Sequence, residues 1–469
     1  LGDLTTTPLR IIPGEAAPFP VEGFDHKWTV DGDVTGQSTS EGLISDFTRY
    51  FNDRLARIRK MLRQRREMVG CVPIKAIRPG AQAEIKIVGI VTEVRTTKNG
   101  HRLIELEDET GTQAILAPAS DHRIIQDAQT LIEDEVVGVV CKAPSKGDLL
   151  ILQSIVRPEI PQGRTPNRGD RGAAVAFVSD VHFGAKTFLQ EDWDRFIRWI
   201  NGTVGDSRQR ALARKVKYLV VVGDLVDGIG IFPGQEDELS IVDGMGQYQY
   251  AGEQLARIRQ DVKIFVLPGN HDLVRPAEPQ PAFPDKYRKC FDERVVHIGN
   301  PCRLQVEGVE ILNYHGRSFD DWIMRVQGLT YQEPLAAMEE MLKRRHVLPV
   351  YGLRTPIAPE HKDYLVIDSV PDIFVTGHVH SAGIKNYRGV TLINSSCWQS
   401  QTSYQKMHGF NPEPSKVPVV ELDNGRTWMM DFHLNRPAGI DANPEAAHMA
   451  IEGGLSGRNA KPVLPSVEF

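Results

Sequence analysis

Five stretches of the sequence place aspartate, asparagine or histidine directly after a short apolar run. They read AAVAFVSDVHFG (173–184), LVVVGDLVDG (219–228), IFVLPGNHD (264–272), ILNYHG (311–316) and IFVTGHVH (373–380). Such runs, bounded by glycine and polar residues, are typical of buried strands. Asp180 and His182 are two residues apart, so on an extended backbone their side chains point the same way, as a chelating pair requires. We expect five strand ends to bring these groups to one edge of a sheet.

The side chains in these stretches are metal ligands of the oxygen and imidazole type. A set of this kind without thiolate suits manganese, iron, zinc or nickel rather than a calcium cage. A single aspartate or histidine at a strand end is more often an ordinary hydrogen-bonded residue than a ligand. The interpretation therefore depends on the whole set, and the alternative is a core that retains these residues without binding metal.

The order and spacing of the five stretches resemble the motifs of the calcineurin-like metallophosphoesterase superfamily, over residues 173–400. These motifs are D-x-H, G-D-x-x-D, G-N-H-D, a single H and G-H-x-H. The resemblance implies two divalent cations, manganese first, with iron, zinc, nickel or magnesium as alternatives. One metal would be held by Asp180, His182, Asp224 and His380, and the other by Asp224, Asn270, His315 and His378. Two cations about 3.5–4 Å apart can clamp a phosphate and activate a water.

The same resemblance implies roles for residues that do not bind metal. His271 would meet the phosphate and either stabilise developing charge or protonate the leaving oxygen. Asp272 would orient His271, as a carboxylate orients an imidazole. Gly223, Gly269 and Gly377 precede ligands at points where the chain must turn sharply off a strand.

The elements that must position this set follow from the hydrophobic pattern. Residues 172–434 alternate apolar strands with helical stretches at 191–201, 206–217 and 253–259, and close with a hairpin, which predicts an α/β domain. Residues 73–160 hold five short β-like segments and resemble an OB-fold barrel. Because no aromatic residue lies between 83 and 156, a structural or protein-docking role is favoured over base stacking. The expected fold is multidomain: an N-terminal all-β OB-like barrel, then an α/β four-layer calcineurin-like phosphoesterase domain.

Three other segments complete the predicted organisation. Residues 1–44 are interpreted as a linker or extended arm, and residues 435–469 as a flexible tail. Residues 45–72 form a basic amphipathic helix, whose charged faces fit a solvated surface and a phosphate-contacting surface equally well.

The segments beside the metal motifs indicate which of the superfamily's reactions to expect. An OB-like domain directly before a phosphoesterase domain is similar to the small subunits of replicative DNA polymerases, which are related to the double-strand-break-repair nuclease. GDLVDGIGIFPGQEDEL (223–239) and GRSFDD (316–321) resemble the archaeal D-family small subunits in particular. The eukaryotic relatives, the polymerase B-subunits, have lost the ligands, whereas all are present here. The resemblance therefore implies a proofreading 3′→5′ exonuclease; the alternatives are a non-catalytic scaffold subunit and a metallophosphatase or phosphodiesterase acting on other phosphoesters.

Composition limits the location and the partners. The chain of 469 residues is 41% apolar and 25% charged, which is ordinary for a soluble protein, and its net charge of −6 argues against a uniformly basic nucleic-acid surface. Five scattered cysteines, no signal-peptide pattern and no run of membrane length favour a cytoplasmic, nucleoid-associated protein without a membrane partner. The implied partners are a large catalytic subunit in a heterodimer, single-stranded 3′ ends and primer–template DNA, with a sliding clamp as a further candidate.

Overall fold

The structure is a computed structural model that describes residues 8–21, 23–78, 84–143 and 148–434. The chain divides into two units, Leu1–Phe432 and His433–Phe469, and every element named below belongs to the first. The tail predicted at 435–469 lies outside the described residues. Within those residues, no helix combines the length and the apolar character needed to cross a bilayer.

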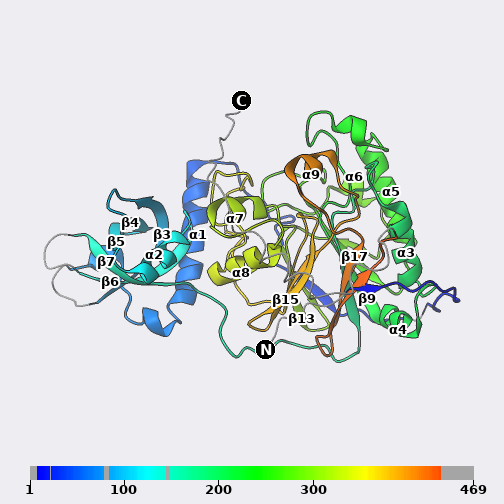
Figure 1. The fold of residues 1–469 in the computed structure, drawn as a ribbon, viewed down its shortest axis with the longest axis horizontal. Coiled ribbons are helices and arrows are strands. Elements are labelled where there is room, and N and C mark those ends of the chain that lie inside the picture. Colours follow the sequence, from blue (N-terminus) through cyan, green and yellow to red (C-terminus); the bar gives the residue numbers. More distant parts are fainter. Residues whose placement is uncertain (1–7, 22, 79–83, 144–147, 435–469) are drawn as a thin grey trace, which may run out of the picture. The chain divides into compact units, whose positions relative to one another are not determined.

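Five strands form a closed barrel in the order β3-β4-β5-β7-β6 (Figure 1). Their bounds are β3 (Ile85–Thr96), β4 (Arg102–Asp108), β5 (Gly111–Ala117), β6 (Val136–Lys142) and β7 (Leu150–Val156). The predicted five-stranded barrel is thereby confirmed. Sequence patterning did not predict α2 (His122–Gln129), which Asp121 caps and which adds Ile124 and Ala128 to the barrel core.

The remaining strands form two mixed sheets. The first has the order β1-β18-β17-β8-β9-β10-β11, with β1 (Leu9–Arg10), β18 (Thr427–Asp431), β17 (Lys416–Glu421), β8 (Ala174–Val178), β9 (Val216–Val222), β10 (Lys263–Leu267) and β11 (Val295–His297). The second has the order β15-β16-β14-β13-β12-β2, with β15 (Ala382–Tyr387), β16 (Val390–Ser395), β14 (Ile373–Thr376), β13 (Val309–Asn313), β12 (Cys302–Val306) and β2 (Trp28–Asp31). Strands β8 to β11 are parallel, as are β13, β14 and β16, so each set ends at a common edge.

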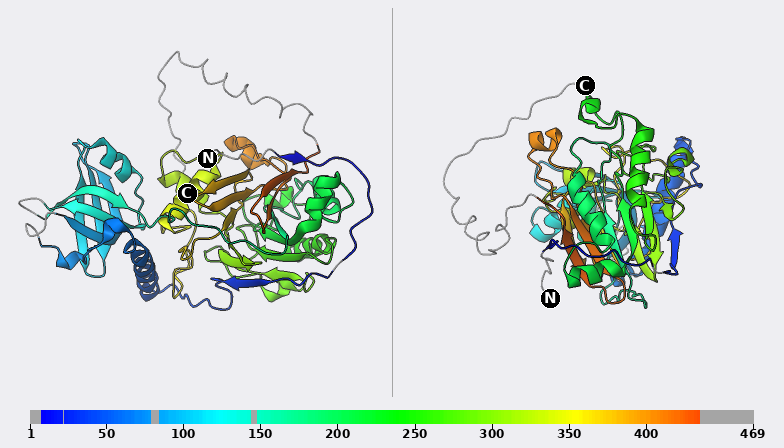
Figure 2. Two further views of the ribbon diagram at one scale, coloured as in Figure 1. Left: turned by 90° about the horizontal axis from the view of Figure 1, so that it is seen from below. Right: turned by 90° about the vertical axis from the view of Figure 1, so that its right-hand side faces the viewer.

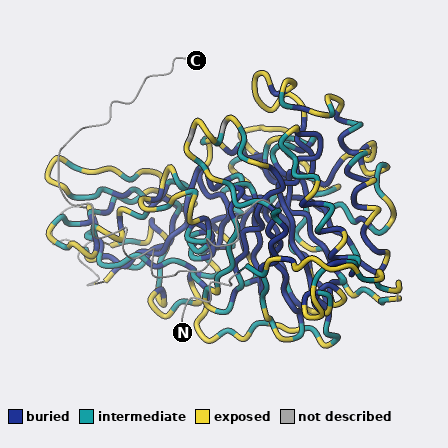
Figure 3. The backbone as a smooth tube through the Cα atoms, turned by 45° about the vertical axis from the view of Figure 1, so that its right-hand side comes forward, coloured by how far each residue is buried: buried dark blue, intermediate teal, exposed yellow. Residues whose placement is uncertain are grey.

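Three apolar cores show how the sheets and helices are layered. Phe177 of β8 packs with Ile311 of β13 in a core between the two sheets, whereas its neighbour Val178 faces Trp193 in a core under helices. Both faces of β8 are thus buried, as its continuous apolar run requires. Figure 3 shows buried backbone gathered in the interior, with exposed segments around it. Figure 1 shows α7 and α8 beyond the second sheet and α3 and α5 beyond the first.

Three of the helices described after the barrel overlap the predicted stretches at 191–201, 206–217 and 253–259, and the other four have no counterpart among those stretches. Their bounds are α3 (Gln190–Ile200), α4 (Ser207–Lys215), α5 (Gly244–Ala256), α6 (Asp285–Arg288), α7 (Phe319–Arg325), α8 (Pro334–Arg344) and α9 (Ser403–His408), with short 3-10 turns at Arg66–Met68, Ile74–Ala76 and Gln235–Glu238. The helix expected at 253–259 begins nine residues earlier, at Gly244, because Asp243 caps it there. The predicted hairpin of β17 and β18 is confirmed.

The segment expected to be an arm adds an edge strand to each sheet. β1 pairs in parallel with β18, and β2 pairs antiparallel with β12. Two- and four-residue strands carry too little periodicity to be predicted from sequence, and they form because the sheet edges offer unpaired backbone groups.

The basic helix predicted at 45–72 is shorter in the structure: α1 spans Ile44–Leu62, and a 3-10 turn at Arg66–Met68 follows it. The helix packs against the outside of the barrel, with Leu55 and Ile58 against Val136 (Figure 2). Arg54, predicted to lie on a charged face, is completely buried and pairs with Asp363 at 2.7 Å. Arg59 pairs with Glu109 of the barrel. These two arginines contact carboxylates of the chain itself. They therefore belong neither to a solvated surface nor to a phosphate-contacting one, the two roles predicted for this helix.

Candidate metal centre

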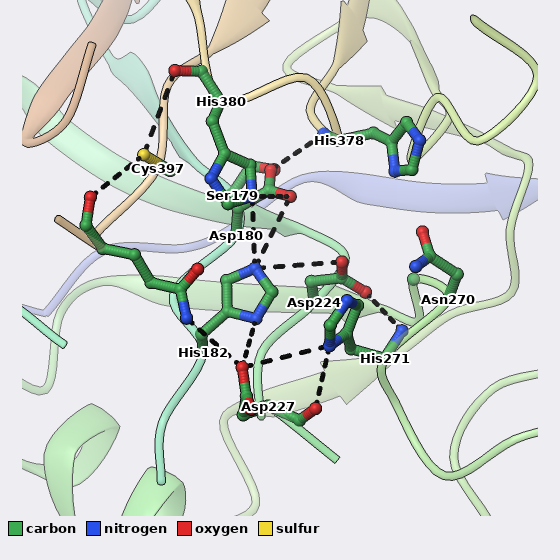
Figure 4. Close-up of polar contacts among 12 residues, drawn as sticks. Ser179, Asp180, His182, Asp224, Asp227, Asn270, His271, His378, His380 and Cys397 are labelled. Carbon is green, nitrogen blue, oxygen red and sulfur yellow. Dashed lines mark hydrogen bonds and ion pairs between the residues drawn. The ribbon is translucent and has the colours of Figure 1, made fainter. Parts of the chain in front are cut away.

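The structure brings all seven predicted ligands together at the carboxyl ends of the central strands. Asp180 and His182 follow β8, Asp224 follows β9, and Asn270 follows β10. From the second sheet, His315 follows β13, while His378 and His380 follow β14. The neighbouring strand ends of the two packed sheets therefore bring together side chains that are up to 200 residues apart in sequence (Figure 4).

Asp180, His182 and His380 form one group. The Nε2 atoms of the two histidines lie 3.3 Å apart, and Oδ1 of Asp180 lies 3.3 Å from Nε2 of His380 and 3.9 Å from Nε2 of His182. All three side chains are buried and turn one ligand atom each toward a common point.

Asp224, His315 and His378 form a second group. Oδ2 of Asp224 lies 3.3 Å from Nε2 of His315, which is also 3.0 Å from Oδ1 of Asn270. The same Asp224 oxygen is 4.0 Å from Nε2 of His182 in the first group. One carboxylate thus reaches both groups, which is the position that a bridging ligand requires.

The donor set fits a divalent cation. Oδ1 of Asp180 is buried and has no hydrogen-bond partner among the described residues, although two imidazole nitrogens face it. Burial opposes ionisation of this carboxyl, but His380 lowers the pKa of Asp180. Burial likewise opposes ionisation of Asp224, and the charges of His315 and His271 hold its pKa well below the ordinary value. Two buried carboxylates stay ionised because positive charge faces them, and a cation would supply such charge.

Two of the imidazoles are oriented by acceptors at Nδ1, which leaves Nε2 for the centre. His182 Nδ1 lies 3.0 Å from Oδ1 of Asp227, and His315 Nδ1 lies 3.0 Å from the carbonyl oxygen of Val222. Acceptors of this kind fix the ring orientation of metal-binding histidines. His380 Nδ1 lies 2.9 Å from Nε2 of Gln405, an amide nitrogen that donates, so this contact places the ring without accepting a proton from it.

The backbone at the site is strained. Asp180, His182, Asp224, His378 and His380 all have φ between 50° and 71°. This left-handed region costs a non-glycine residue about 1–3 kcal/mol and is found mainly at functional sites. The extended backbone expected for Asp180 and His182 is therefore wrong: β8 ends at Val178, and left-handed turns aim the two side chains.

Two of the glycines are required by close approach rather than by the expected sharp turn. Gly223 does have φ of 85°, as expected. A Cβ on Gly377, however, would lie 1.7 Å from Oγ of Ser179, and one on Gly269 would lie 2.2 Å from Oδ1 of Asp224. Packing of one ligand loop against another explains these two positions.

The predicted partnership of Asp272 with His271 does not occur. His271 Nδ1 lies 2.8 Å from the carbonyl oxygen of Asp227 and 3.9 Å from its Oδ1 (Figure 4). The Asp272 carboxylate instead accepts hydrogen bonds from the backbone N–H groups of Leu225, Val226 and Gly269. Burial, together with the charge of Asp224, raises the pKa of Asp272 to about 7. Asp272 therefore joins two ligand loops, and Asp227 takes the place predicted for it.

Sequence reasoning assigned no role to four residues that contact the predicted histidines or their partners: Asp227, Asp320, Gln235 and Gln405. Asp227 could have been found, because it is the second aspartate of the G-D-x-x-D motif. Gln235 and Asp320 lie inside the two stretches that resemble the D-family subunits, but nothing in those stretches indicates what they contact, and Gln405 lies on α9 outside any motif. Three aromatic residues near strand ends, Tyr248, Trp322 and Trp398, are buried core residues.

Comparison with known proteins gives concordant matches. Residues 175–384 match the family model of the B-subunits of DNA polymerases alpha and epsilon. The DNA polymerase II small subunit of Archaeoglobus fulgidus is 46% identical over 387 residues, which are 82% of this chain and 77% of the relative. The same subunit from Methanothermobacter thermautotrophicus is 43% identical, covering 87% and 83%, and that from Thermoplasma acidophilum is 42% identical, covering 83% and 78%.

Proposed function

The chain belongs to the family of archaeal DNA polymerase II small subunits, the D-family, and from this premise we propose that it is the proofreading 3′→5′ exonuclease subunit of such a polymerase. Its partner would be the large catalytic subunit, and its substrate would be the single-stranded 3′ end of a primer. The domain at 172–434 would be of the calcineurin-like metallophosphoesterase type. The observation that carries the proposal is the convergence of seven oxygen and imidazole ligands in two adjacent groups, which the Asp224 carboxylate connects.

Each residue of the site would have a distinct role. Asp180, His182, Asp224 and His380 would hold one divalent cation and Asp224, Asn270, His315 and His378 the other, with manganese the first candidate. Bound there, two cations would neutralise phosphate charge and activate a water for attack. The carbonyl of Asp227 accepts a hydrogen bond from Nδ1 of His271, which leaves the other ring nitrogen for the substrate; in the imidazolium form that nitrogen would donate to the phosphate or to the leaving 3′-oxygen. Water would add to phosphorus as the P–O3′ bond breaks, releasing a nucleoside 5′-monophosphate and a strand with a new 3′-hydroxyl.

Proofreading requires that an unpaired 3′ end reach this site more easily than a paired one. Separating the last base from its partner costs least at a mismatch, so a mismatched end would enter more often. The preference would then need no recognition of the mismatch itself.

The test is shortening of a 5′-labelled single-stranded oligonucleotide by the full chain, alone and with its large subunit, in manganese and in chelator. We expect a metal-dependent ladder that is abolished by Asp224→Asn. The matched control, Asp285→Asn, changes an aspartate side chain that is 81% exposed and should leave the ladder intact. His271→Ala should retain manganese in titration calorimetry while slowing shortening by about 10²–10⁴-fold.

The outcomes separate the alternative functions. Manganese binding without shortening of any DNA would indicate a scaffold subunit and refute the proposal. Hydrolysis of p-nitrophenyl phosphate without shortening of DNA would indicate a phosphatase. A His271→Ala variant that loses activity only because it loses metal would contradict the role given to His271.

A further inference from the structure

The pocket above the candidate metal centre has a polar floor and a partly apolar wall. It has a volume of about 720 Å³, within the range of small-molecule sites, and His182, Asp224, Asn270 and His378 are among its lining residues. Four other lining residues make up what we term the apolar wall: Phe232, Tyr331, Met407 and Phe410. Phe232 is 38% exposed and Met407 is 78% exposed, although side chains of these types are usually buried.

Each part of the apolar wall lies on a segment that contacts a histidine of the centre or the partner of one. Gln235, three residues after Phe232 in the chain, donates to Oδ2 of Asp227 at 2.8 Å. Asp227 in turn contacts His182. The hydroxyl of Tyr331 donates to Oδ1 of Asp320 at 2.7 Å, and Oδ2 of Asp320 lies 3.9 Å from Nε2 of His378.

The third connection runs through α9, which carries Met407. Gln405 of this helix caps its N-terminus together with Thr402 and lies 2.9 Å from Nδ1 of His380. The rings of Phe410 and Tyr331 pack edge to face, 4.8 Å apart, and thereby join the second and third parts. These contacts therefore fix the position of the apolar wall relative to the metal ligands.

We propose that the apolar wall binds the nucleobase of the 3′-terminal nucleotide while its phosphate lies at the metal centre; this inference rests on the proposed function. Partly or fully exposed aromatic and methionine side chains beside a phosphate site match the two chemical halves of a nucleotide. Stacking on such side chains accepts any base, because every base has a π-face, and methionine adapts to rings of different size. The wall would thus make the site tolerant of sequence while requiring a base to be present.

Binding of fragments tests the base contact directly. With manganese present, titration calorimetry compares dAMP with 2-deoxyribose 5-phosphate, which has the same phosphate and sugar but no base. We expect dAMP to bind about 5- to 100-fold more tightly, the range of a stacked base. Met407→Ala and Phe410→Ala should reduce this ratio and leave the affinity for 2-deoxyribose 5-phosphate unchanged.

The matched control is Met324→Ala, which removes a methionine that is 53% exposed and is not among the residues lining the pocket. It should leave the ratio unchanged. Because Met407 is largely exposed, its replacement should not impair folding, so a null result cannot be attributed to unfolding.

An exonuclease assay separates failure of this inference from failure of the proposed function. Oligonucleotides ending in a normal or in an abasic 3′ nucleotide are compared, and the abasic end should be removed more slowly. Equal rates for the two ends, or equal affinities for the two fragments, would overturn the base contact while leaving the exonuclease intact. No shortening of either oligonucleotide, with manganese bound, would refute the exonuclease and the base contact with it.

Discussion

Asp227, which is not among the predicted ligands, joins several side chains of the site. Its carboxylate contacts Nδ1 of His182 and accepts hydrogen bonds from Gln235 and Gln399, and its carbonyl faces His271. Burial opposes ionisation of this carboxyl, yet His182 lowers the pKa of Asp227. It thus stays charged where it can orient a ligand without occupying the centre.

Replacing Asp227 with alanine should weaken manganese binding by about 10–100-fold, the usual effect of losing the partner of a metal-binding imidazole. Asp227→Asn keeps an oxygen that can accept from His182 and should retain more of the affinity. Titration calorimetry measures both, with Asp237→Ala, at an exposed position of the same loop, as the control. Unchanged affinity in Asp227→Ala would contradict the orienting role.

His297 gives a prediction for stability against pH. Neither of its ring nitrogens has a hydrogen-bond partner among the described residues, and it packs against Phe283 and Phe291. Burial, reinforced by the charge of Arg288, lowers the pKa of His297 to about 4. Between its ordinary pKa of about 6.5 and 4, the unfolded imidazole takes up a proton and the folded one does not, so stability falls as pH falls.

We therefore expect His297→Phe to flatten the pH dependence of the free energy of unfolding between pH 6.5 and 4. Urea unfolding followed by circular dichroism at several pH values measures this slope. His361→Phe serves as the control, because it replaces an exposed histidine. A slope that does not change in His297→Phe would show that this imidazole titrates normally in the folded protein.

At the scale of elements, α1 is fixed by a buried ion pair rather than by its amphipathic pattern alone. Arg54 donates to Oδ2 of Asp363 and to the carbonyl oxygens of Asp134 and Pro349, and His346 Nε2 lies 2.8 Å from the same Asp363 oxygen. Burial lowers the pKa of His346 to about 4, so this imidazole is neutral and Arg54 provides the balancing charge. Helix, barrel and the loop before β14 therefore share one buried charged group.

Arg54→Met should destabilise the protein by about 3–5 kcal/mol, because it leaves the Asp363 carboxylate buried without its cation. Arg49→Met, at a side chain that is 56% exposed, breaks a surface pair with Asp46 and should cost less than about 1 kcal/mol. The shift of the urea midpoint measures both. Equal shifts in the two variants would show that burial of the pair has no energetic consequence.

At the scale of the whole molecule, the strained ligand loops should make folding sensitive to the cation. A cation that binds only the folded chain stabilises it by RT ln(1 + [L]/Kd), about 2.7 kcal/mol at one hundred times Kd. Scanning calorimetry should therefore show a higher Tm in manganese than in chelator, and no such shift in Asp224→Asn. The same rise in Tm in the variant would place the stabilising cation elsewhere.

The sequence by itself determined which residues could form the centre. Each ligand lies just after a strand, and the apolar run of that strand is visible in the order of its residues. The sequence also determined the five strands of the barrel, the closing hairpin and the approximate positions of α3, α4 and α5, since these depend on local periodicity.

Only the tertiary structure decided the partners of these residues. It assigned His271 to Asp227 instead of Asp272, buried Arg54 of a helix that reads as surface, and added edge strands too short to show periodicity. It also set five ligands in left-handed backbone. The physical reason is that an orienting contact joins loops far apart in the chain, and its energy depends on distances that only the packed sheets define.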